Sequence, residues 1–323
     1  MNFSRRKFLG LAAGAAALPG VSSIAWAQPY PSRPVRIIGV SAGSGPDILT
    51  RLLSQWLSER LGQPFIIENR PGGGGNIATE AAVRAPADGY TLLTVATGSA
   101  INATLYDKLS FSFIRDLAPV ASFIRQPYVM VVNPSIPART VPEIVAYARA
   151  NPGKINMASS GIGSGPHMAG ELFKLMAGVD MVHVPYRGGA SALTDLLSGQ
   201  VQMWFPAPAA AIEQIRTGTL RALAVTTAAR WEALPDIPAI AEFVPGYEAS
   251  SWFGLVAPRS TPAEIVDVLN QEINAGLADT KIKARIVGLG GGSFTSSPEE
   301  FGKFIAKETE KWGAVVRAAN IKV

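Results

Sequence analysis

The sequence predicts an α/β protein made of two doubly wound lobes. Short apolar runs alternate with stretches whose apolar residues recur three and four positions apart, which is typical of parallel strands connected by helices. This alternation occurs in both halves of a 323-residue chain, a length that allows two units of about 150 residues each. No low-complexity linker separates the halves, so the chain can cross between the lobes more than once.

The first half predicts alternating strands and helices. The apolar run Val35–Val40 predicts a strand, and a Gly/Ser loop separates it from a helix that begins at Pro46 or Asp47 and ends at Leu61, before Gly62. The other expected elements are strands Phe65–Glu68 and Thr91–Val95 and a helix from Asn76 to about Arg84. This order implies a parallel sheet.

The second half repeats the alternation. Thr140 and Glu143 form a predicted capping box that opens a helix ending at Ala150. The other expected elements are strands Tyr128–Val132, Ile155–Ala158, Met181–Val184, Val201–Phe205 and Leu220–Thr226, helices Pro166–Ala177 and Ala190–Ser198, and an apolar run Trp252–Val256. Two helices with an N-cap, Pro at the first helical position and Glu two residues later are expected to finish the chain, at Thr261–Glu264 and Ser297–Glu300.

The net charge of +5 comes mainly from the N-terminus. Residues 1–27 contain Arg5, Arg6 and Lys7 and no acid, which leaves 26 basic and 24 acidic residues in the rest of the chain. A basic start, an apolar run and the small-x-small sequence Ala25-Trp26-Ala27 predict a cleavable export signal, with a mature chain that begins near Gln28 outside the cytoplasm. The paired arginines favour the twin-arginine route, and an ordinary Sec signal is the alternative. A membrane anchor is the other interpretation, but the run is short for the ~20 residues of a span.

Composition excludes several classes of protein. The chain has no Cys, which excludes a disulfide scaffold, an iron–sulfur cluster and a thiol nucleophile, and its two His leave little for a histidine-based metal centre. The remaining basic residues are scattered without interleaved aromatics, so no nucleic-acid partner is expected. We expect no cofactor and no metal.

The most informative feature is a repeated loop. Gly43-Ser44-Gly45-Pro46 in the first half and Gly163-Ser164-Gly165-Pro166 in the second each follow a strand and end in Pro at the start of a helix. Glycine permits close backbone approach, and the free N–H groups and positive dipole end of a helix N-terminus favour an anion. Two such loops on two lobes predict a site that closes on a carboxylate. The alternative is that both are ordinary turns.

A serine hydrolase is the main enzymatic alternative. Residues 39–43 match G-x-S-x-G with Ser41 as the nucleophile. The helix begins several residues after Ser41, whereas a nucleophile elbow enters its helix almost at once. The strand before it is also the first of the mature chain, which leaves no earlier loop for an oxyanion hole.

Two weaker motifs favour structural roles. Gly73-x-Gly75-x-x-Ala78 resembles a dinucleotide fingerprint, but Arg70-Pro71 separates it from its strand and no acid ends the next strand, so a close-packed turn is expected. His167 and Glu171 lie four residues apart on a helix and could share a metal, but no further ligand has a suitable spacing. A surface or capping role is therefore expected for this pair.

From Tyr30 onward the sequence resembles the solute-binding receptors of tripartite tricarboxylate transporters, the Bug-type family. The stretches that carry the resemblance are residues 30–38, 43–47, 68–72, 76–77, 87–93, 159–164, 184–189 and 234–238. They cover essentially the whole mature chain in order.

The resemblance implies a periplasmic binding protein of type II-like fold with a ligand cleft between its lobes and no catalytic activity. It implies a first lobe of residues 28–127 and 255–323 and a second lobe of residues 128–254. It also implies that a small organic carboxylate is the ligand, that membrane subunits of such a transporter are the partners and that the receptor is monomeric. The alternative partner is the ectodomain of a sensor kinase.

The resemblance also implies which residues bind the ligand. They lie in the two loops, after the third strand and around residues 186 and 207: Ser41, Ala42, Gly43, Ser44, Gly45, Thr97, Ser99, Ser159, Ser160, Gly161, Gly163, Ser164, His167, Tyr186, Arg187 and Ala207. The sequence departs from the family at Gly39-Val40, where Pro and an aromatic are common, and at Pro206-Ala207-Pro208, where an Asp is common. The second departure favours an aromatic or less polar carboxylate over an amino acid. Trp204, Phe205, Trp252 and Phe253 are expected in the core, with cleft lining as the alternative.

Overall fold

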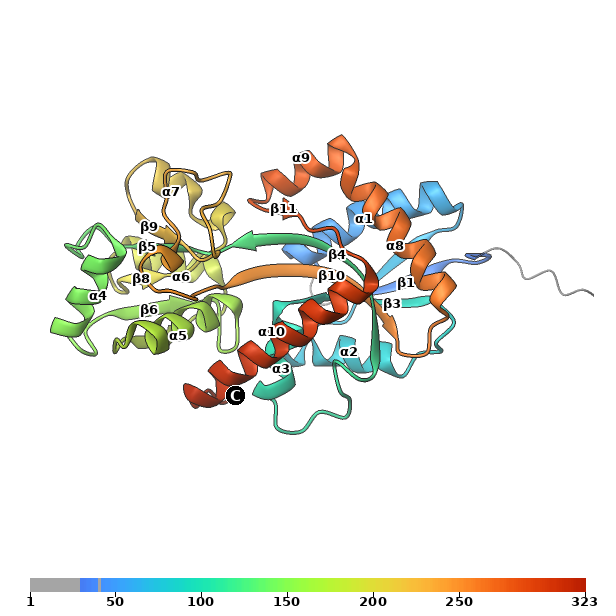
Figure 1. Cartoon of the computed structure of the whole chain (residues 1–323), viewed down its shortest axis with the longest axis horizontal. Coiled ribbons are helices and arrows are strands. Elements are labelled where there is room, and N and C mark those ends of the chain that lie inside the picture. Colours follow the sequence, from blue (N-terminus) through green and yellow to red (C-terminus); the bar gives the residue numbers. More distant parts are fainter. Residues whose placement is uncertain (1–29, 40–41) are drawn as a thin grey trace, which may run out of the picture.

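Two mixed sheets covered by helices form two lobes (Figure 1). The structure, a computed structural model, describes residues 30–39 and 42–323, so the expected export signal and Ser41 lie outside the described part of the chain. The first sheet has six strands in the order β11-β4-β10-β3-β1-β2, and the second has five in the order β7-β6-β8-β5-β9. The predicted fold class is confirmed.

The first sheet is parallel where the sequence predicts it. Strand β1 pairs in parallel with β2 and β3, while β10 adds antiparallel pairs with β3 and β4. The strands are β1 (Val35–Gly39), β2 (Phe65–Asn69), β3 (Thr91–Ala96), β4 (Leu117–Pro127), β10 (Ser250–Pro258) and β11 (Gly292–Ser293). The helices are α1 (Gly45–Leu61), α2 (Asn76–Val83), α3 (Thr97–Leu105), α8 (Ala263–Ala278), α9 (Thr280–Gly288) and α10 (Pro298–Ala318).

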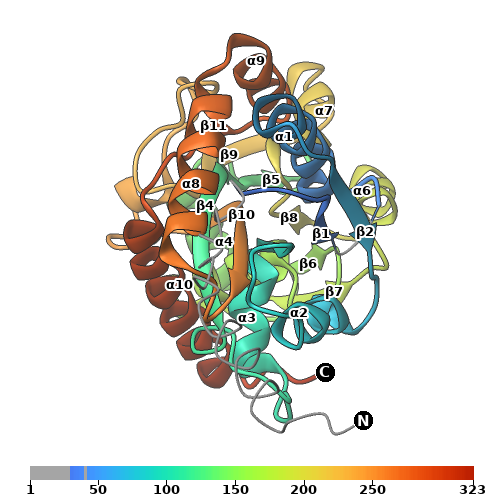
Figure 2. The ribbon, with the colours of Figure 1, turned by 90° about the vertical axis from the view of Figure 1, so that its right-hand side faces the viewer.

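Alternating side chains of this sheet fill two cores. Ile37 and Leu92 pack with α1, α8 and α9 on one face, whereas Ile38 and Leu93 pack with α2, α3 and α10 on the other (Figure 2). Successive residues of a strand point to opposite faces, so a nearly unbroken apolar run is what a sheet covered on both sides requires.

The second sheet has the same mixed character. Strand β6 pairs in parallel with β7 and β8, and β5 pairs antiparallel with β8 and β9. The strands are β5 (Val129–Val132), β6 (Asn156–Ser159), β7 (Val182–Pro185), β8 (Met203–Trp204) and β9 (Arg221–Val225). The helices are α4 (Val141–Ala150), α5 (Gly165–Ala177), α6 (Gly189–Leu197) and α7 (Ile212–Arg216).

Strands β4 and β10 cross between the two lobes side by side (Figure 1). They are antiparallel, with Pro258 opposite Leu117 at one end and Ser250 opposite Pro127 at the other. At the second end, the Thr226 hydroxyl accepts the Tyr128 N–H at 2.7 Å and donates to the Ala249 carbonyl at 2.7 Å. The crossing is therefore hydrogen-bonded to the second sheet.

Helix α10 packs beside this crossing. It contacts α3 and β4 of the first lobe and α5 of the second. Glu308 of α10 is buried and accepts the indole N–H groups of Trp252 on β10 at 3.0 Å and of Trp312 at 2.9 Å. Trp204, Phe205, Trp252 and Phe253 are all buried, as expected for core residues.

Several expected elements differ from the structure. Strand β4 was not expected, because Pro119 and Pro127 interrupt its apolar pattern, and α3 was not expected, because it begins with a Thr-Gly-Ser sequence typical of loops. The expected strand Val201–Phe205 shortens to β8. Three helices finish the chain rather than two, because the polar α9 follows α8 directly.

The predicted cap at Thr261 is wrong. Pro262 has an extended ψ of 138°, so α8 begins one residue later and Thr261 lies too far away to cap it. The predicted capping box is complete at α10, where Ser297 and Glu300 satisfy each other. At α4 only half of it forms: Thr140 accepts the Glu143 N–H, but the Glu143 side chain accepts the N–H of Arg139 rather than that of Thr140. Among the helices of the described residues, none combines the length and the apolar character that a membrane span requires.

Candidate ligand-binding site

The two predicted loops have the same backbone conformation. Gly43 and Gly163 have φ angles of 73° and 72°, in the left-handed region that glycine tolerates. Ser44 and Ser164, with φ of −72° and −69°, are the N-caps of α1 and α5. The repeat in the sequence is therefore a repeat in structure.

In each loop, the side chain four residues after the first glycine accepts the N–H of that glycine. Gly43 donates its N–H to Asp47 Oδ2 at 2.9 Å, and Gly163 donates its N–H to His167 Nδ1 at 3.1 Å. Ser44 Oγ accepts the Asp47 N–H and Ser164 Oγ accepts the His167 N–H, both at 3.4 Å. Pro46 and Pro166 have no N–H. In the described part of the chain, Gly45 and Gly165 are thus left with first-turn amides that meet no acceptor.

The two loops differ in charge. Asp47 is a buried carboxylate at the N-terminus of α1, and Arg51 donates to it from the next turn at 2.9 Å. Burial raises the pKa of Asp47, but hydrogen bonds from Arg51, Asn69 and Gly43 outweigh it and hold the pKa below its usual range. The second loop has His167 in the corresponding place, so a neutral side chain can stand where the first loop has a negative one.

A third helix N-terminus, that of α3, adjoins these loops and was not expected from the sequence. Its N-cap is Ala96, whose side chain cannot cap, and Ser99 Oγ accepts the Ala96 N–H at 3.4 Å. Nothing lies within 4 Å of where a methyl group on Gly98 would stand. The first turn of α3 therefore presents open backbone, and Gly98 joins the candidate residues.

Residues of the crossing strands bring the three N-termini together. Phe253 of β10 lies 3.4 Å from the position of a methyl group on Gly45, and it pairs with Ala96 across β3. A methyl group on Gly165 would lie 1.7 Å from the Tyr128 hydroxyl oxygen, which also interacts with the side chains of Thr97 and Ser251. The starts of α1, α3 and α5 therefore adjoin one crossing segment.

Tyr128 and Phe253 are functional candidates that sequence reasoning missed. Tyr128 is buried, and burial raises the pKa of its hydroxyl, which stays a proton donor in the ordinary pH range. Tyr128 stands where a strand was expected, but nothing local in the sequence indicates that it meets α5. Gly165 and Tyr128 come into contact only in the folded chain, so their contact could not be predicted from neighbouring residues.

The predicted residues of the second loop are tightly connected. Tyr186 donates its N–H to the Ser159 carbonyl at 3.0 Å, and Ser159 Oγ accepts the Gly161 N–H at 3.1 Å. Ser160 follows, half-buried. Of the surface or capping role expected for His167 and Glu171, the surface part is wrong, because both side chains are buried, 3% and 6% exposed, while His167 accepts the Gly163 N–H at the start of α5. Helix α5 turns them toward β6 and β7 instead of toward solvent, and His167 meets the other histidine, His183.

Ser159 Oγ lies 2.6 Å from His183 Nε2, the distance of a nucleophile–base pair. Ser159 is fully buried, however, and its hydroxyl also bonds to the backbone of Gly161. His183 stacks on His167 rather than on a carboxylate that would orient it. This geometry supports a rigid loop rather than a reactive serine. In the described residues, no group of three or more carboxylates and imidazoles could hold a metal ion.

The remaining predicted residues lie at the edges. Ala42 is exposed beside Gly43, and Thr97 accepts the Trp252 N–H at 3.0 Å. The Tyr186 hydroxyl donates to Asp195 at 2.7 Å. Burial, and to a lesser extent the neighbouring Asp195, raises the pKa of Tyr186 to about 12. Arg187 is exposed, and Ala207 is half-buried just before a short turn. Among these edge residues of the second lobe, Tyr186 is the one whose backbone bonds to the second loop in the described part of the chain.

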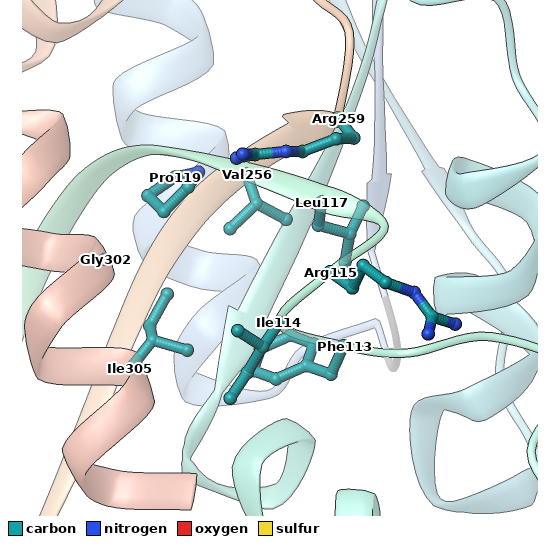
Figure 3. A pocket seen from close by; sticks show the side chains of 9 residues that line it. All are labelled: Phe113, Ile114, Arg115, Leu117, Pro119, Val256, Arg259, Gly302 and Ile305. Carbon is teal, nitrogen blue, oxygen red and sulfur yellow. The ribbon is translucent and has the colours of Figure 1, made fainter.

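The pocket in Figure 3 lies elsewhere. It has a volume of about 450 Å³, and Arg259 extends over it. Its lining includes Leu117, Pro119 and Val256, which lie toward the ends of β4 and β10 that are remote from the candidate site. Val256 stands five residues from Ser251, about 17 Å along an extended strand. A second pocket of about 320 Å³ lies between the lobes, where Pro208 and Trp231 face Val287 and Gly290.

Comparisons with known proteins identify the family. The model of the tripartite tricarboxylate transporter family receptor matches residues 49–321. Protein BugT of Bordetella pertussis is 34% identical over 311 residues, 95% of each chain. The structure of R. palustris Rpa4515 with adipate is 37% identical, with a TM-score of 0.78, and covers 91% of this chain and 99% of that one.

A further solved structure, MatC from Rhodopseudomonas palustris with bound malate, is 29% identical with a TM-score of 0.75 and covers 89% of this chain and 100% of that one. The residues matched by the family model include the second loop, the crossing strands and α10, so the likeness extends over most of the elements that form the candidate site. The chain belongs to the tripartite tricarboxylate transporter receptor family.

Proposed function

We propose that this protein is a periplasmic receptor that captures a small organic carboxylate between its lobes. The observation that carries the proposal is the convergence of three helix N-termini on one crossing segment, with the Gly45 and Gly165 amides left without acceptors. Such groups stabilise an anion through hydrogen bonds and helix dipoles. The related structures with adipate and with bound malate support a carboxylate as the ligand.

The proposed site combines the two loops with the start of α3. Ser41 to Gly45 and Ser159 to His167 contact the anion from opposite lobes, Thr97, Gly98 and Ser99 contact it from α3, and Tyr128 adds a hydroxyl donor. Tyr186, Arg187 and Ala207 contact the distal part of the ligand. Pro206 and Pro208, which flank Ala207, are buried, and they favour a less polar distal group over an ammonium.

The proposed mechanism is binding and closure without a chemical step. The lobes are residues 28–127 with 255–323 and residues 128–254, and strands β4 and β10 form the connection about which they close. Closure changes the surface offered to the membrane subunits of a tripartite transporter. The receptor reaches them as a monomer exported by its N-terminal signal.

Gly98→Ala tests the site with little risk to the fold. A methyl group there meets no protein atom within 4 Å, and alanine favours a helix over glycine by about 1 kcal/mol. We expect unchanged or slightly higher thermal stability but weaker binding of adipate and malate, measured by calorimetry, because the methyl group enters the ligand's space.

Gly288→Ala is the matched control, since Gly288 also has open space around it and ends α9, which contributes none of the three helix N-termini of the site. It should, like Gly98→Ala, leave stability unchanged or slightly higher, and it should leave binding unchanged. If Gly98→Ala binds these acids as tightly as the wild type, the α3 part of the site is wrong. If the wild type binds no member of a carboxylate library, the receptor proposal fails as a whole.

A further inference from the structure

The chain contains two histidines, and they stack on each other behind the second loop. The ring centroids of His167 on α5 and His183 on β7 are 3.6 Å apart, with an angle of 17° between the rings. His167 and His183 are 16 positions apart, one on a helix and one on a strand, so local spacing does not bring them together and the stack is a product of the α5–β7 packing.

Each histidine contacts one end of the loop. His167 Nδ1 accepts the Gly163 N–H at 3.1 Å at the helix end. His183 Nε2 lies 2.6 Å from Ser159 Oγ at the strand end, and that oxygen also accepts the Gly161 N–H. The stacked pair therefore fixes residues 159–163 from both sides.

We propose that the stacked His167–His183 pair is a positioning element that keeps the second loop in its anion-binding conformation while both rings are neutral, so that acid loosens the loop and releases the ligand. The release of ligand rests on the proposed receptor function. The effect of acid on the loop is independent of that function.

The hydrogen-bond geometry gives the reason. A neutral imidazole has one nitrogen that accepts, whereas a protonated ring has two donors. Since Nδ1 of His167 accepts from Gly163, a proton on Nδ1 places two N–H groups against each other. The loop must then move away from the ring, and the amides of its helix N-terminus move with it.

The charged groups around the pair have opposing effects on the pKa of His183. Glu171 Oε1 lies 3.6 Å from His167 Nε2, and Lys174 Nζ lies 2.9 Å from the same carboxylate oxygen. Burial and then His167 lower the pKa of His183 to about 4, Glu171 opposes this and Lys174 adds to it. These are the ionisable groups that act on His183, and together with burial they favour a neutral His183 ring near neutral pH.

The first loop lacks this sensitivity. Asp47 accepts the Gly43 N–H in the place where His167 accepts the Gly163 N–H. Because the pKa of Asp47 is held below its usual range, this acceptor persists at a pH at which an imidazole is protonated. Acid therefore acts on one of the two matched loops.

His167→Asn separates the acceptor from the titration. The Asn Oδ1 occupies the position of Nδ1 and can accept the Gly163 N–H, but it does not take up a proton. In ligand-free, untagged protein, NMR can follow both imidazoles without overlap, because the chain has two. We expect the Gly163 amide resonance to shift in step with the imidazole titration in the wild type and to stay constant in His167→Asn, from about pH 7.5 to about pH 4.

Affinity for adipate provides the second measurement. Wild type and His167→Asn are compared at about pH 7.5 and about pH 5, where the titration of adipate itself affects both equally. The wild type should lose at least about tenfold more affinity than the variant. Glu171→Gln should move the wild-type loss to lower pH, while Glu213→Gln, the same change at an exposed ion pair on α7, should leave it unchanged.

Two results would overturn the proposal. One is a Gly163 amide that shifts equally in His167→Asn, and the other is an equal loss of affinity in both proteins. If adipate and other dicarboxylates bind neither protein at any pH, the receptor function fails instead, and the Gly163 titration still decides whether the histidine pair controls the loop.

Discussion

At the scale of single residues, the two loops show how the same backbone can hold different chemistry. Their glycines and serines have matching φ angles and matching hydrogen bonds, yet the residue that accepts the glycine amide is Asp47 in one loop and His167 in the other. The backbone sets the direction of the free amides. The fourth residue sets the charge that a ligand meets.

Gly165 is the residue whose replacement should be most disruptive. A methyl group there would lie 1.7 Å from the hydroxyl oxygen of the buried Tyr128 and 2.6 Å from its ring carbon. Overpacking of this kind costs about 1–3 kcal/mol, so Gly165→Ala should lower the free energy of unfolding measured in urea by that amount. Tyr128→Phe removes the nearest atom and should recover part of the loss.

The control for this prediction is Gly288→Ala, where a methyl group meets no atom within 4 Å. A Gly165→Ala protein as stable as Gly288→Ala would contradict the packing of Tyr128 on the start of α5.

At the scale of elements, the sequence predicted the loops and helix caps that depend on a few neighbouring residues. The Gly-Ser-Gly-Pro loops and the caps at Thr140 and Ser297 were predictable because each depends on a few neighbouring residues. Strand β4, helix α3 and the place of Tyr128 were not, because they depend on pairings such as Ser250 with Pro127, which are remote in sequence. The part of the site that the sequence concealed is therefore the part that the crossing strands assemble.

Two similar motifs give a prediction at this scale. Ser297 Oγ accepts the Glu300 N–H at 3.1 Å, whereas the buried Thr261 Oγ1 has no partner in the described residues. Ser297→Ala should cost about 1 kcal/mol of unfolding free energy through loss of the cap. Thr261→Val should be neutral or stabilising, because it removes a buried hydroxyl that makes no hydrogen bond.

Denaturant titrations of both variants measure the difference. Equal losses of unfolding free energy would mean that the Thr261 hydroxyl stabilises the fold through an interaction other than capping α8.

At the scale of the whole molecule, the proposed binding site and the connection between the lobes lie at the same segment. Strands β4 and β10 join the sheets, α10 packs against both lobes, and the three helix N-termini adjoin the same crossing. Under the proposed function, a ligand there would contact both lobes next to the segment about which they would close. Small rearrangements at the proposed site would then be coupled to the relative position of the lobes.

The stability of the whole molecule should fall with acid in two stages. The pKa of His183 is lowered from 6.5 to about 4, so between these values the unfolded chain binds a proton that the folded chain does not. The free energy of unfolding therefore rises with pH across this window and is lost as pH falls through it. Asp47, Glu68 and Glu171 have lowered pKa values and add a second loss at lower pH, as the folded carboxylates become protonated.

His183→Gln isolates the first stage, since glutamine can bond to Ser159 and does not titrate. Denaturant unfolding at a series of pH values should give this variant a flatter dependence than the wild type between pH 6.5 and about 4, and the same dependence below it. Equal slopes in the upper window would mean that His183 takes up its proton as readily in the folded protein as in the unfolded chain. The stacking of the half-buried His183 on His167 would then impose no cost on protonation, contrary to its geometry.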